Sequence, residues 1–252
     1  MGKPASGASL DAGNSLYSHL TAAGSAVWAM LEGSGTTSAD SSGNGHGLTL
    51  DGTCSWSTDG AGNAIVTYGG AAGGHACAVT GPPDLAGTSS WSFAWRGKIT
   101  GANTFNVFAG GEASGSNIDF VKGVRLEFDS KAGGSYKFDS YATDFLNDHD
   151  YLLVYDQPNA RLHLYVDGAE VTGSPLTVAS NDAAVKFASL GAGFDGSDSF
   201  SILGSLTYGY LMAGYAASST DASNLHADPY SIFSAGGGSP APHLLSSLGV
   251  GA

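Results

Sequence analysis

The octapeptide RLHLYVDG at Arg161–Gly168 decides the fold of this chain. Its apolar residues Leu162, Leu164 and Val166 alternate with other side chains, as in a β-strand with one face on a core and the other in water. The Asp-Gly pair that ends it is a strong short-range signal for a hairpin turn. The octapeptide therefore predicts an antiparallel hairpin in a sheet with one buried face.

The same pattern recurs over most of the chain. In Ser90–Arg96 the rings of Trp91, Phe93 and Trp95 fall on one side of an extended strand. Short runs of this kind, bounded by Gly, Asp, Asn and Ser, are typical of an all-β protein. They occur at Ala26–Leu31, Gly47–Leu50, Ala64–Tyr68, Ala76–Thr80, Trp91–Ile99, Phe105–Ala109, Val124–Phe128, Tyr136–Tyr141, Tyr151–Tyr155, Arg161–Val166, Leu176–Ala179, Phe187–Leu190 and Ile202–Tyr215.

Helical signals are scarce, because no stretch of ten or more residues before residue 218 keeps a 3.6-residue period. Ser219–Ala227 predicts one short helix, capped by Ser or Thr and followed by Asp228-Pro229. The predicted fold class is all-β, an antiparallel jelly-roll β-sandwich with a short C-terminal helix. We expect an N-terminal arm at 1–14, the sandwich at 15–235, and a Gly/Pro linker with a C-terminal tail at 236–252.

Composition excludes some classes of partner. The chain has 252 residues, 42% of them hydrophobic and 12% charged, with a net charge of −13. So acidic a surface repels the phosphates of nucleic acids, and we expect no nucleic-acid partner. Nowhere do 18 apolar residues run together, so we expect no membrane span. Cations, neutral glycans and basic protein partners stay open, as does assembly into a homo-oligomer.

Two cysteines, Cys54 and Cys77, lie in strand-like segments separated by one further strand. They are too few for a disulfide framework, and a metal site would need other ligands nearby. Two outcomes stay open from the sequence, a disulfide between them or two small buried thiols.

Four patterns follow one another along the chain and together span about residues 15–233. They are WAMLEGSGTTSADSSGNG at Trp28–Gly45, the stretch from Trp56 to Gly70, LYVDG at Leu164–Gly168, and Leu190–Ala192 followed by Leu225–Phe233. In this order they resemble the laminin-G-like domains of the concanavalin A-like lectin and glucanase superfamily, in its bacterial and phage branch. The resemblance implies a lectin-like jelly-roll sandwich.

In relatives with this pattern, the loop that corresponds to DSSGNG at Asp40–Gly45 helps to hold calcium. The resemblance therefore implies that Asp40 and Asn44 supply oxygen ligands, since calcium takes six to eight of them. The chain departs from the family where an acidic pair is common, because Thr207 and Tyr208 stand there instead. The alternative is a loop of Asx turns without a metal ion.

Signals for catalysis are missing. The Glu-x-Asp-x-x-Glu strand of concanavalin-like glucanases is absent, and glutamate occurs only at positions 32, 112, 127 and 170. The chain has no Gly-x-Ser-x-Gly elbow and no phosphate-binding glycine loop. We therefore expect no enzyme activity and name no catalytic residues. The sequence also singles out no ligand-binding residues, because most tyrosines on strands pack in a core.

The resemblance covers adhesion modules, carbohydrate-binding appendages and structural proteins of phage particles. Because no apolar leader is visible near residue 1, we predict a non-catalytic virion structural protein of a phage, as a head decoration, fibre or tail surface component. Its partners would be other capsid or tail proteins, its location the virion surface, and residues 1–14 or 236–252 its attachment arms. The alternative is an extracellular carbohydrate-binding or adhesion domain that contacts a host-surface glycan.

Overall fold

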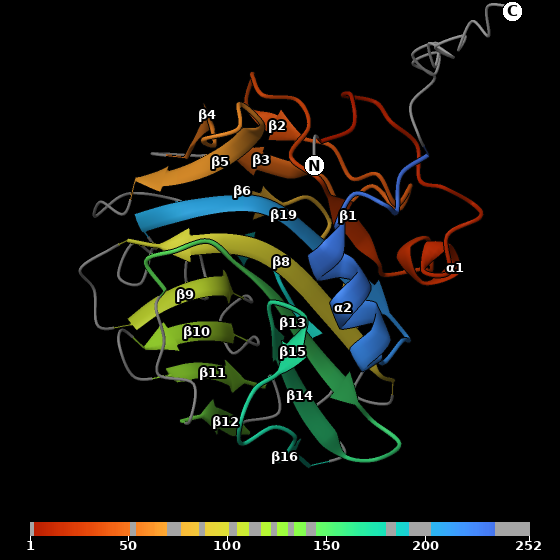
Figure 1. Ribbon diagram of the computed structural model, residues 1–252, viewed down its shortest axis with the longest axis vertical. Helices are drawn as coiled ribbons and strands as arrows, with labels where there is room; N and C mark the ends of the chain where they lie inside the picture. Colours follow the sequence, from red (N-terminus) through yellow and green to blue (C-terminus); the bar gives the residue numbers. More distant parts are fainter. Residues whose placement is uncertain are drawn as a thin grey trace, which may run out of the picture.

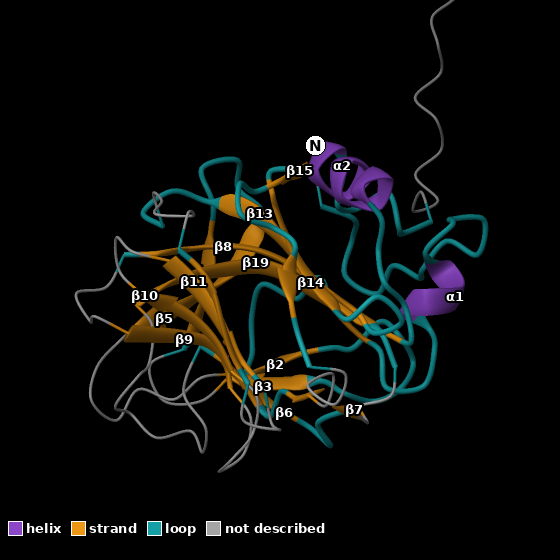
Figure 2. Cartoon of the chain, turned by 90° about the horizontal axis from the view of Figure 1, so that it is seen from below, coloured by secondary structure: helices purple, strands orange, loops and turns teal. Residues whose placement is uncertain are grey.

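Strands from distant parts of the chain pair into two large antiparallel sheets, which lie face to face in the computed structural model (Figure 1, Figure 2). Within the described residues, the predicted all-β jelly-roll sandwich with a short C-terminal helix is confirmed. The structure describes residues 3–50, 54–69, 77–85, 89–100, 105–110, 117–121, 125–130, 134–139, 145–179, 185–191 and 203–234.

The first sheet has the order β15-β14-β13-β8-β19-β5-β4, with β1 also pairing with β19 and β16 with β14. The pairs β13–β8, β8–β19, β19–β5 and β1–β19 join strands far apart in the sequence, so this sheet ties the two halves of the chain together. Its strands are β1 (Ala26–Trp28), β4 (Ser55–Thr58), β5 (Ala64–Gly69), β8 (Trp91–Ile99), β13 (His149–Asp156), β14 (Arg161–Val166), β15 (Ala169–Glu170), β16 (Leu176–Thr177) and β19 (Leu203–Ala213).

The second sheet has the order β12-β11-β10-β9-β18-β6-β3-β2. Its strands are β2 (Thr37–Ser38), β3 (Leu48–Leu50), β6 (Cys77–Val79), β9 (Phe105–Gly110), β10 (Asn117–Val121), β11 (Arg125–Asp129), β12 (Ser135–Phe138) and β18 (Ser189–Leu190), and β7 (Asp84–Leu85) pairs separately with β17 (Val185–Lys186). The helices are α1 (Tyr17–Leu20) and α2 (Ser219–Ala227). Within the described ranges, no helix has the length and apolar character needed to cross a membrane.

The predicted hairpin turn lies between β14 and β15, where Val166 pairs with Ala169. Asp167 has a φ of 49° and Gly168 a φ of 79°. Two positive φ values in succession are the mark of a type I′ turn, whose twist matches that of the flanking strands. Because only Gly, Asn and Asp adopt this conformation readily, the local sequence is sufficient to fix the turn.

The main core fills the space between the two sheets. Trp91, Phe93 and Trp95 on β8 are each at most 1% exposed, which confirms that they share a buried face. The ring of Trp91 lies 5.4 Å from that of Phe128 on β11, and Phe93 lies 5.5 Å from Phe187, as measured between ring centroids. Offset and edge-on aromatic contacts of this kind add to the free energy gained by burying apolar surface.

The opposite face of the first sheet, called the outer face below, is also covered. Ser92 and Ala94 on β8 are buried, and Ala94 belongs to a second apolar cluster with Leu152 on β13 and Leu225 on α2. The prediction that this face lies in water is therefore wrong for the middle of the sheet. The reason is that α2 lies across the outer face, on the side away from the second sheet (Figure 2).

α2 begins and ends where the sequence predicts. The Ser218 hydroxyl accepts a hydrogen bond from the backbone N–H of Asp221, and the Asp221 carboxylate accepts one from the backbone N–H of Ser218. This reciprocal capping box satisfies two donors that a helix N-terminus leaves free. Asp228, which precedes Pro229, is extended, and the helix stops there.

Residues 3–14 of the segment predicted as an arm lie against the body of the protein. Leu10 forms a β-bridge with Phe233, and both are buried in the second apolar cluster. The backbone N–H of Asp11 donates to the carbonyl of Ile232 at 2.8 Å. The stretch before α1 and the stretch after α2 therefore hold each other, while the tail predicted at 236–252 is outside the described residues.

Cys54 and Cys77 are both thiols outside any disulfide in the structure, the first half-buried and the second buried. A hydrogen bond with Cys54, together with burial, raises the pKa of the Cys77 thiol well above its ordinary value. Of the two outcomes left open by the sequence, the structure therefore has the pair of thiols. A high thiol pKa makes Cys77 a weak nucleophile.

A glycine contact between the sheets generates the first prediction. Gly191 has a φ of 92°, and a Cβ added there would lie 2.5 Å from the ring of Tyr68 on β5. Gly214 has a φ of 73° with nothing within 4 Å of an added Cβ. Gly214→Ala should cost about 1 kcal/mol through backbone strain alone. Gly191→Ala should cost about 1–3 kcal/mol more, because the Tyr68 ring must move.

Urea unfolding at constant m-value measures both variants. Equal losses in the free energy of unfolding would contradict the close approach of Gly191 to Tyr68.

Candidate functional site

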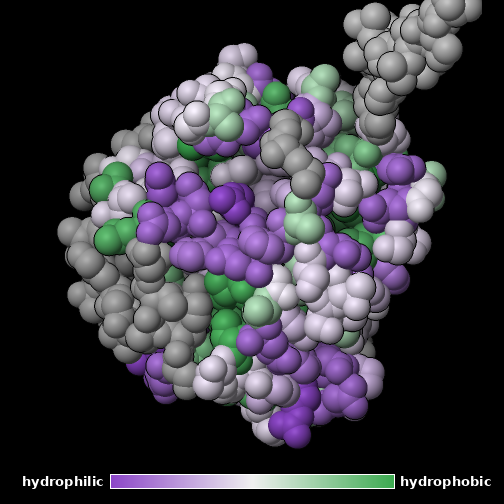
Figure 3. Space-filling view, in the orientation of Figure 1, coloured by the Kyte–Doolittle hydropathy of each residue, from purple (hydrophilic) through white to green (hydrophobic). Residues whose placement is uncertain are grey.

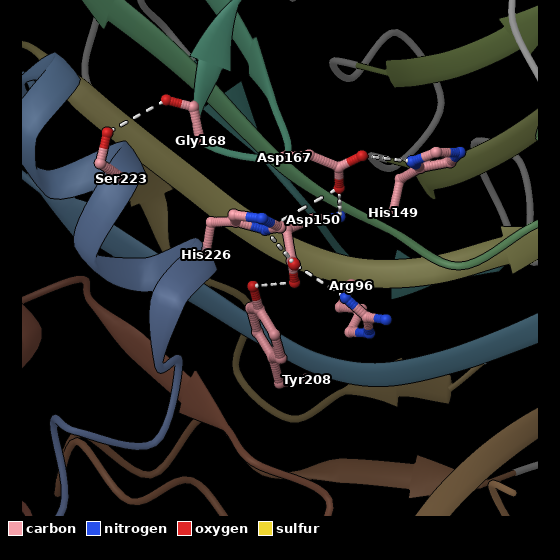
Figure 4. A network of polar contacts seen from close by, with 8 residues as sticks. All are labelled: Arg96, His149, Asp150, Asp167, Gly168, Tyr208, Ser223 and His226. Atoms are coloured by element: carbon pink, nitrogen blue, oxygen red, sulfur yellow. Dashed lines mark hydrogen bonds and ion pairs between the residues drawn. The ribbon is translucent and has the colours of Figure 1, made fainter. Parts of the chain in front are cut away.

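A buried carboxylate on β13 lies at the centre of a polar network on the outer face (Figure 4). Asp150 is 7% exposed. Its Oδ2 accepts hydrogen bonds from Arg96 Nη1 at 2.7 Å and from His226 Nδ1 at 2.8 Å, and its Oδ1 accepts one from the Tyr208 hydroxyl at 2.9 Å. Three donors from three elements therefore replace the water that this carboxylate loses on folding.

Strand register explains why these groups meet. Arg96 on β8 is directly opposite Asp150 on β13, and it is also opposite Tyr208 on β19. The three side chains therefore form a row across adjacent strands on one face of the sheet. α2 crosses that face and brings His226 to the same carboxylate. Burial, followed by the field of Asp150, raises the pKa of Tyr208 well above its ordinary value, so its hydroxyl stays a donor.

A second carboxylate, Asp167, fixes the backbone beside this row. It accepts hydrogen bonds from the backbone N–H of Asp150 at 3.0 Å and from His149 Nδ1 at 2.6 Å. Burial raises the pKa of Asp167, but these bonds outweigh that effect and leave the pKa below its ordinary value. Gly168, next in the turn, packs against α2, and a Cβ there would lie 3.2 Å from Cβ of His226.

Three of these residues have metal-ligand chemistry. Oxygen atoms of Asp150 and Asp167 and a nitrogen atom of His226 all lie within 4.8 Å of one another. However, the guanidinium of Arg96 already binds Asp150, and His226 bonds to it directly. A metal ion would have to displace a cation and break a hydrogen bond, so the group fits a charge-paired cluster better than a metal site.

A cavity of about 320 Å³ opens beside this network. Figure 3 shows hydrophilic side chains gathered next to α2, over the region where β8 and β19 pass. The cavity is lined by Asp59, Ala61, Asn63, Arg96, Asp150, Thr207, His226, Ala227, Pro229 and Tyr230. Its walls thus come from the β4–β5 turn on one side and from the end of α2 on the other.

Several lining groups keep hydrogen-bonding capacity. The side chains of Arg96 and His226 are 36% and 44% exposed. Beyond Asp150, the remaining guanidinium N–H groups of Arg96 and Nε2 of His226 have no partner among the residues that the structure describes. The Tyr230 hydroxyl is buried and is likewise without a hydrogen bond in the described part of the chain. The cavity can therefore offer several new hydrogen bonds to a ligand.

Asp59 is the acidic group of the opposite wall. Its carboxylate accepts hydrogen bonds from the backbone N–H groups of Ala61 and Asn63 and from the Asn63 side chain, at 2.8–2.9 Å. Burial raises the pKa of Asp59, but these hydrogen bonds lower it by more than burial raises it. The net pKa is therefore below its ordinary value. The same hydrogen bonds hold the turn in one conformation, because the Asp59 and Asn63 side chains bond to the turn itself.

The predicted site residues Asp40 and Asn44 lie together in one loop, away from the cavity lining. Asp40 accepts four hydrogen bonds, from the backbone N–H groups of Val27, Ser42 and His46 and from the Ser42 hydroxyl. Asn44 turns its amide N–H groups to the carbonyls of Ala22 and Ser25.

This loop is closed by hydrogen bonds rather than opened as an oxygen cage. The carbonyl of His46 is also taken, by the indole N–H of Trp28. Calcium needs six to eight oxygens that face it, whereas here the Asp40 oxygens face N–H and O–H donors and Asn44 presents nitrogen. In this arrangement Asp40 and Asn44 do not fit a calcium ion, and they support the strand β1 instead.

Comparison with known proteins identifies a similar fold but no family. The chain matches no family model and no curated protein sequence. Among solved structures it is similar to the binding domain of Paraclostridial Mosquitocidal Protein 1, with a TM-score of 0.59, 11% identity, and coverage of 80% of this chain and 51% of that one. The chain thus spans about half the length of that domain.

Two further structures are similar. Trypanosoma rangeli sialidase in complex with sialic acid has a TM-score of 0.55 and 11% identity, with coverage of 80% of this chain and 32% of that one. Domain 4 of AbnA, a GH43 extracellular arabinanase from Geobacillus stearothermophilus in complex with arabinotriose, has a TM-score of 0.52 and 16% identity, with coverage of 80% and 97%. These likenesses show a β-sandwich fold, and they do not single out the laminin-G family.

The Asp40 loop generates a prediction about metal removal. Because its donors and acceptors are already paired, a millimolar chelator should leave the melting temperature unchanged. Asp40→Ala should lower the free energy of unfolding by about 2–4 kcal/mol, since it strands buried N–H donors. A rise in melting temperature with added calcium that chelation reverses would contradict this reading, because a ligand of the folded state must stabilise it.

Proposed function

We propose that this protein is a non-catalytic carbohydrate-binding β-sandwich domain of laminin-G-like type, with the cavity beside Asp150 as its saccharide site. One observation carries the proposal: a polar cavity whose donors are held in place by a single buried carboxylate. Its volume of about 320 Å³ falls at the lower end of the range of small-molecule sites. The likeness to AbnA domain 4, which was solved with arabinotriose, supports the same ligand class.

The cavity suits hydroxyl groups, which both donate and accept hydrogen bonds. Arg96 offers donors, and Nε2 of His226 is a further hydrogen-bonding atom because Nδ1 is the ring nitrogen that contacts Asp150. Asp59 and Asn63 supply oxygens on the facing wall, and Tyr230 adds a ring. Because Asp150 already holds Arg96 and His226, a ligand does not have to order them, and less conformational entropy is lost on binding.

The charge balance favours a neutral saccharide. The positive charge of Arg96 is matched by Asp150 at 2.7 Å, and Asp59 adds a negative charge on the opposite wall. The chain as a whole carries a net charge of −13. Among the lining residues, Arg96 is a permanent cation against the two carboxylates of Asp59 and Asp150, so an anionic sugar would meet net repulsion from the lining.

Binding without catalysis is part of the proposal. Glycoside hydrolysis usually needs one carboxylic acid with a raised pKa and one carboxylate that acts as base or nucleophile. Asp59 has a lowered pKa, and both oxygens of Asp150 accept hydrogen bonds from protein donors. Neither carboxylate is set up to protonate a leaving group.

The named neighbours are chains of a toxin, a sialidase and an arabinanase, so they favour the carbohydrate-binding alternative over the virion role. We therefore place binding of a neutral host-surface glycan first, with an extracellular location. The virion role, its capsid or tail partners and a homo-oligomeric state stay predictions.

Glycan binding is tested first on an array and then by titration calorimetry, with arabinotriose as a neutral probe and sialic acid as an anionic one. We expect a neutral saccharide to bind and sialic acid to bind more weakly. His226→Ala should weaken the neutral ligand about 5–20-fold, the effect of one lost hydrogen bond of about 1–2 kcal/mol.

His163→Ala is the matched control, because His163 also bonds to a carboxylate, that of Glu170, but does not line the cavity. The control should bind as the wild type does. The proposal fails if no neutral glycan binds, or if His226→Ala and His163→Ala have equal affinities.

A further inference from the structure

Lys3, which lies beside the cavity but outside its lining, is anchored by three backbone carbonyls. Its Nζ lies 3.0 Å from the oxygen of Ala29, 3.2 Å from that of Met30 and 2.7 Å from that of Thr207. An ammonium group has three N–H donors, so each of them can face one carbonyl. Lys3 is separated from Thr207 by 204 positions, so this contact joins the start of the chain to the last strand.

The three carbonyls are available because both strands are interrupted here. β1 ends at Trp28, and Met30 just beyond it has a φ of 53°, which few residues with a side chain adopt. On β19 the pairing with β8 shifts register between Leu206 and Tyr208, so Thr207 faces no partner residue across that ladder. Carbonyls released from a ladder and shielded from water need another donor, and Lys3 supplies it.

The same residue touches both walls of the cavity. The ammonium lies 5.5 Å from the centroid of the Tyr230 ring, within reach of a cation–π contact. The backbone N–H of Lys3 donates to Asn63 Oδ1 at 3.4 Å, and Asn63 in turn donates to Asp59. Tyr230, Asn63 and Thr207 all line the cavity, whereas Lys3 does not.

We infer that Lys3 is a positioning residue for the saccharide cavity, which fixes the separation of the Asn63 and Tyr230 walls without touching the ligand. The inference rests on the proposed function of that cavity. It predicts that ligand affinity depends on a side chain outside the lining, at the far N-terminal end of the chain.

The electrostatics of Lys3 provide an independent readout. Burial lowers the pKa of Lys3 to about 7, against the opposing fields of Asp59 on the β4–β5 turn and Glu32 after β1. Tyr230, after α2, is the other titratable group that faces it. In the unfolded chain a lysine keeps its proton up to a pH of about 10.4. Between these values the unfolded state binds more protons than the folded state, so the cost of burying the Lys3 charge is relieved and the free energy of unfolding rises with pH from about 7 to 10.

The test compares Lys3→Met, which keeps the apolar stem, with Lys98→Met as the matched control. Lys98 lies on β8 and is 39% exposed, with Asp148 as its ion-pair partner at 3.9 Å. We expect Lys3→Met to weaken the neutral saccharide found on the array about 5–20-fold, as for the loss of one to two kcal/mol of binding free energy. Lys98→Met should bind as the wild type does.

The melting temperature of the wild type relative to Lys3→Met should rise between pH 7 and 9.5, and Lys98→Met should show no such difference. Unchanged affinity in Lys3→Met, or a flat difference across this pH range, overturns the inference. A third variant, Lys3→Ala, guards against a general loss of structure. n-Propylammonium has the three carbons and the ammonium that Lys3→Ala removes. It should raise the melting temperature and the saccharide affinity of Lys3→Ala more than tetramethylammonium does, because tetramethylammonium has no N–H donor.

The two proposals can fail separately. If the wild type binds no saccharide, the proposed function is lost, and so is the role of Lys3 toward that ligand. The anchoring of Lys3 is then judged by the pH dependence and by the selective rescue with n-propylammonium. If the wild type binds a saccharide but neither Lys3 variant changes affinity, the cavity keeps its function and the positioning role is wrong.

Discussion

The charge of Asp150 is the constraint on which the outer face of the first sheet depends. A carboxylate withdrawn from water costs several kcal/mol unless protein donors replace its hydration. Arg96, Tyr208 and His226 provide these donors, and each belongs to a different element. The hydrogen bonds that Asp150 accepts therefore fix the side chains of Arg96 and Tyr208 on neighbouring strands, and the bond from His226 also holds α2 against the sheet. The wall of the cavity follows from that arrangement.

Features fixed by neighbours in the sequence could be predicted from it. The turn at Asp167-Gly168 needs two positive φ values, which these residue types accept, and the structure has both. The helix at Ser219–Ala227 begins with a capping box whose partners, Ser218 and Asp221, are three positions apart. In both cases the interaction that decides the structure lies within a few residues, so local chemistry is sufficient.

Features fixed by distant residues could not be predicted in the same way. Arg96 and Asp150 are opposite each other only because β8 pairs with β13, and nothing local sets that register. The alternation along β8 indicates one buried face, yet α2 and the segment around Leu10 bury the other face too. Asp40 and Asn44 lie in one loop, as their pattern predicts. The atoms that face the Asp40 carboxylate are backbone N–H groups of β1 and of the loop, and the sequence pattern does not show them.

The cavity lies where the strands β8, β13 and β19 meet segments that connect regular elements. The β4–β5 turn, the bulge at Thr207 and the stretch after α2 each contribute lining residues, and Lys3 contacts all three from outside the lining. None of them belongs to the core between the two sheets, so their side chains can change without repacking it. A sandwich of this kind can keep its sheets while its binding walls diverge. That separation is compatible with a likeness in fold to the binding domain of Paraclostridial Mosquitocidal Protein 1 and to domain 4 of AbnA at only 11% and 16% identity.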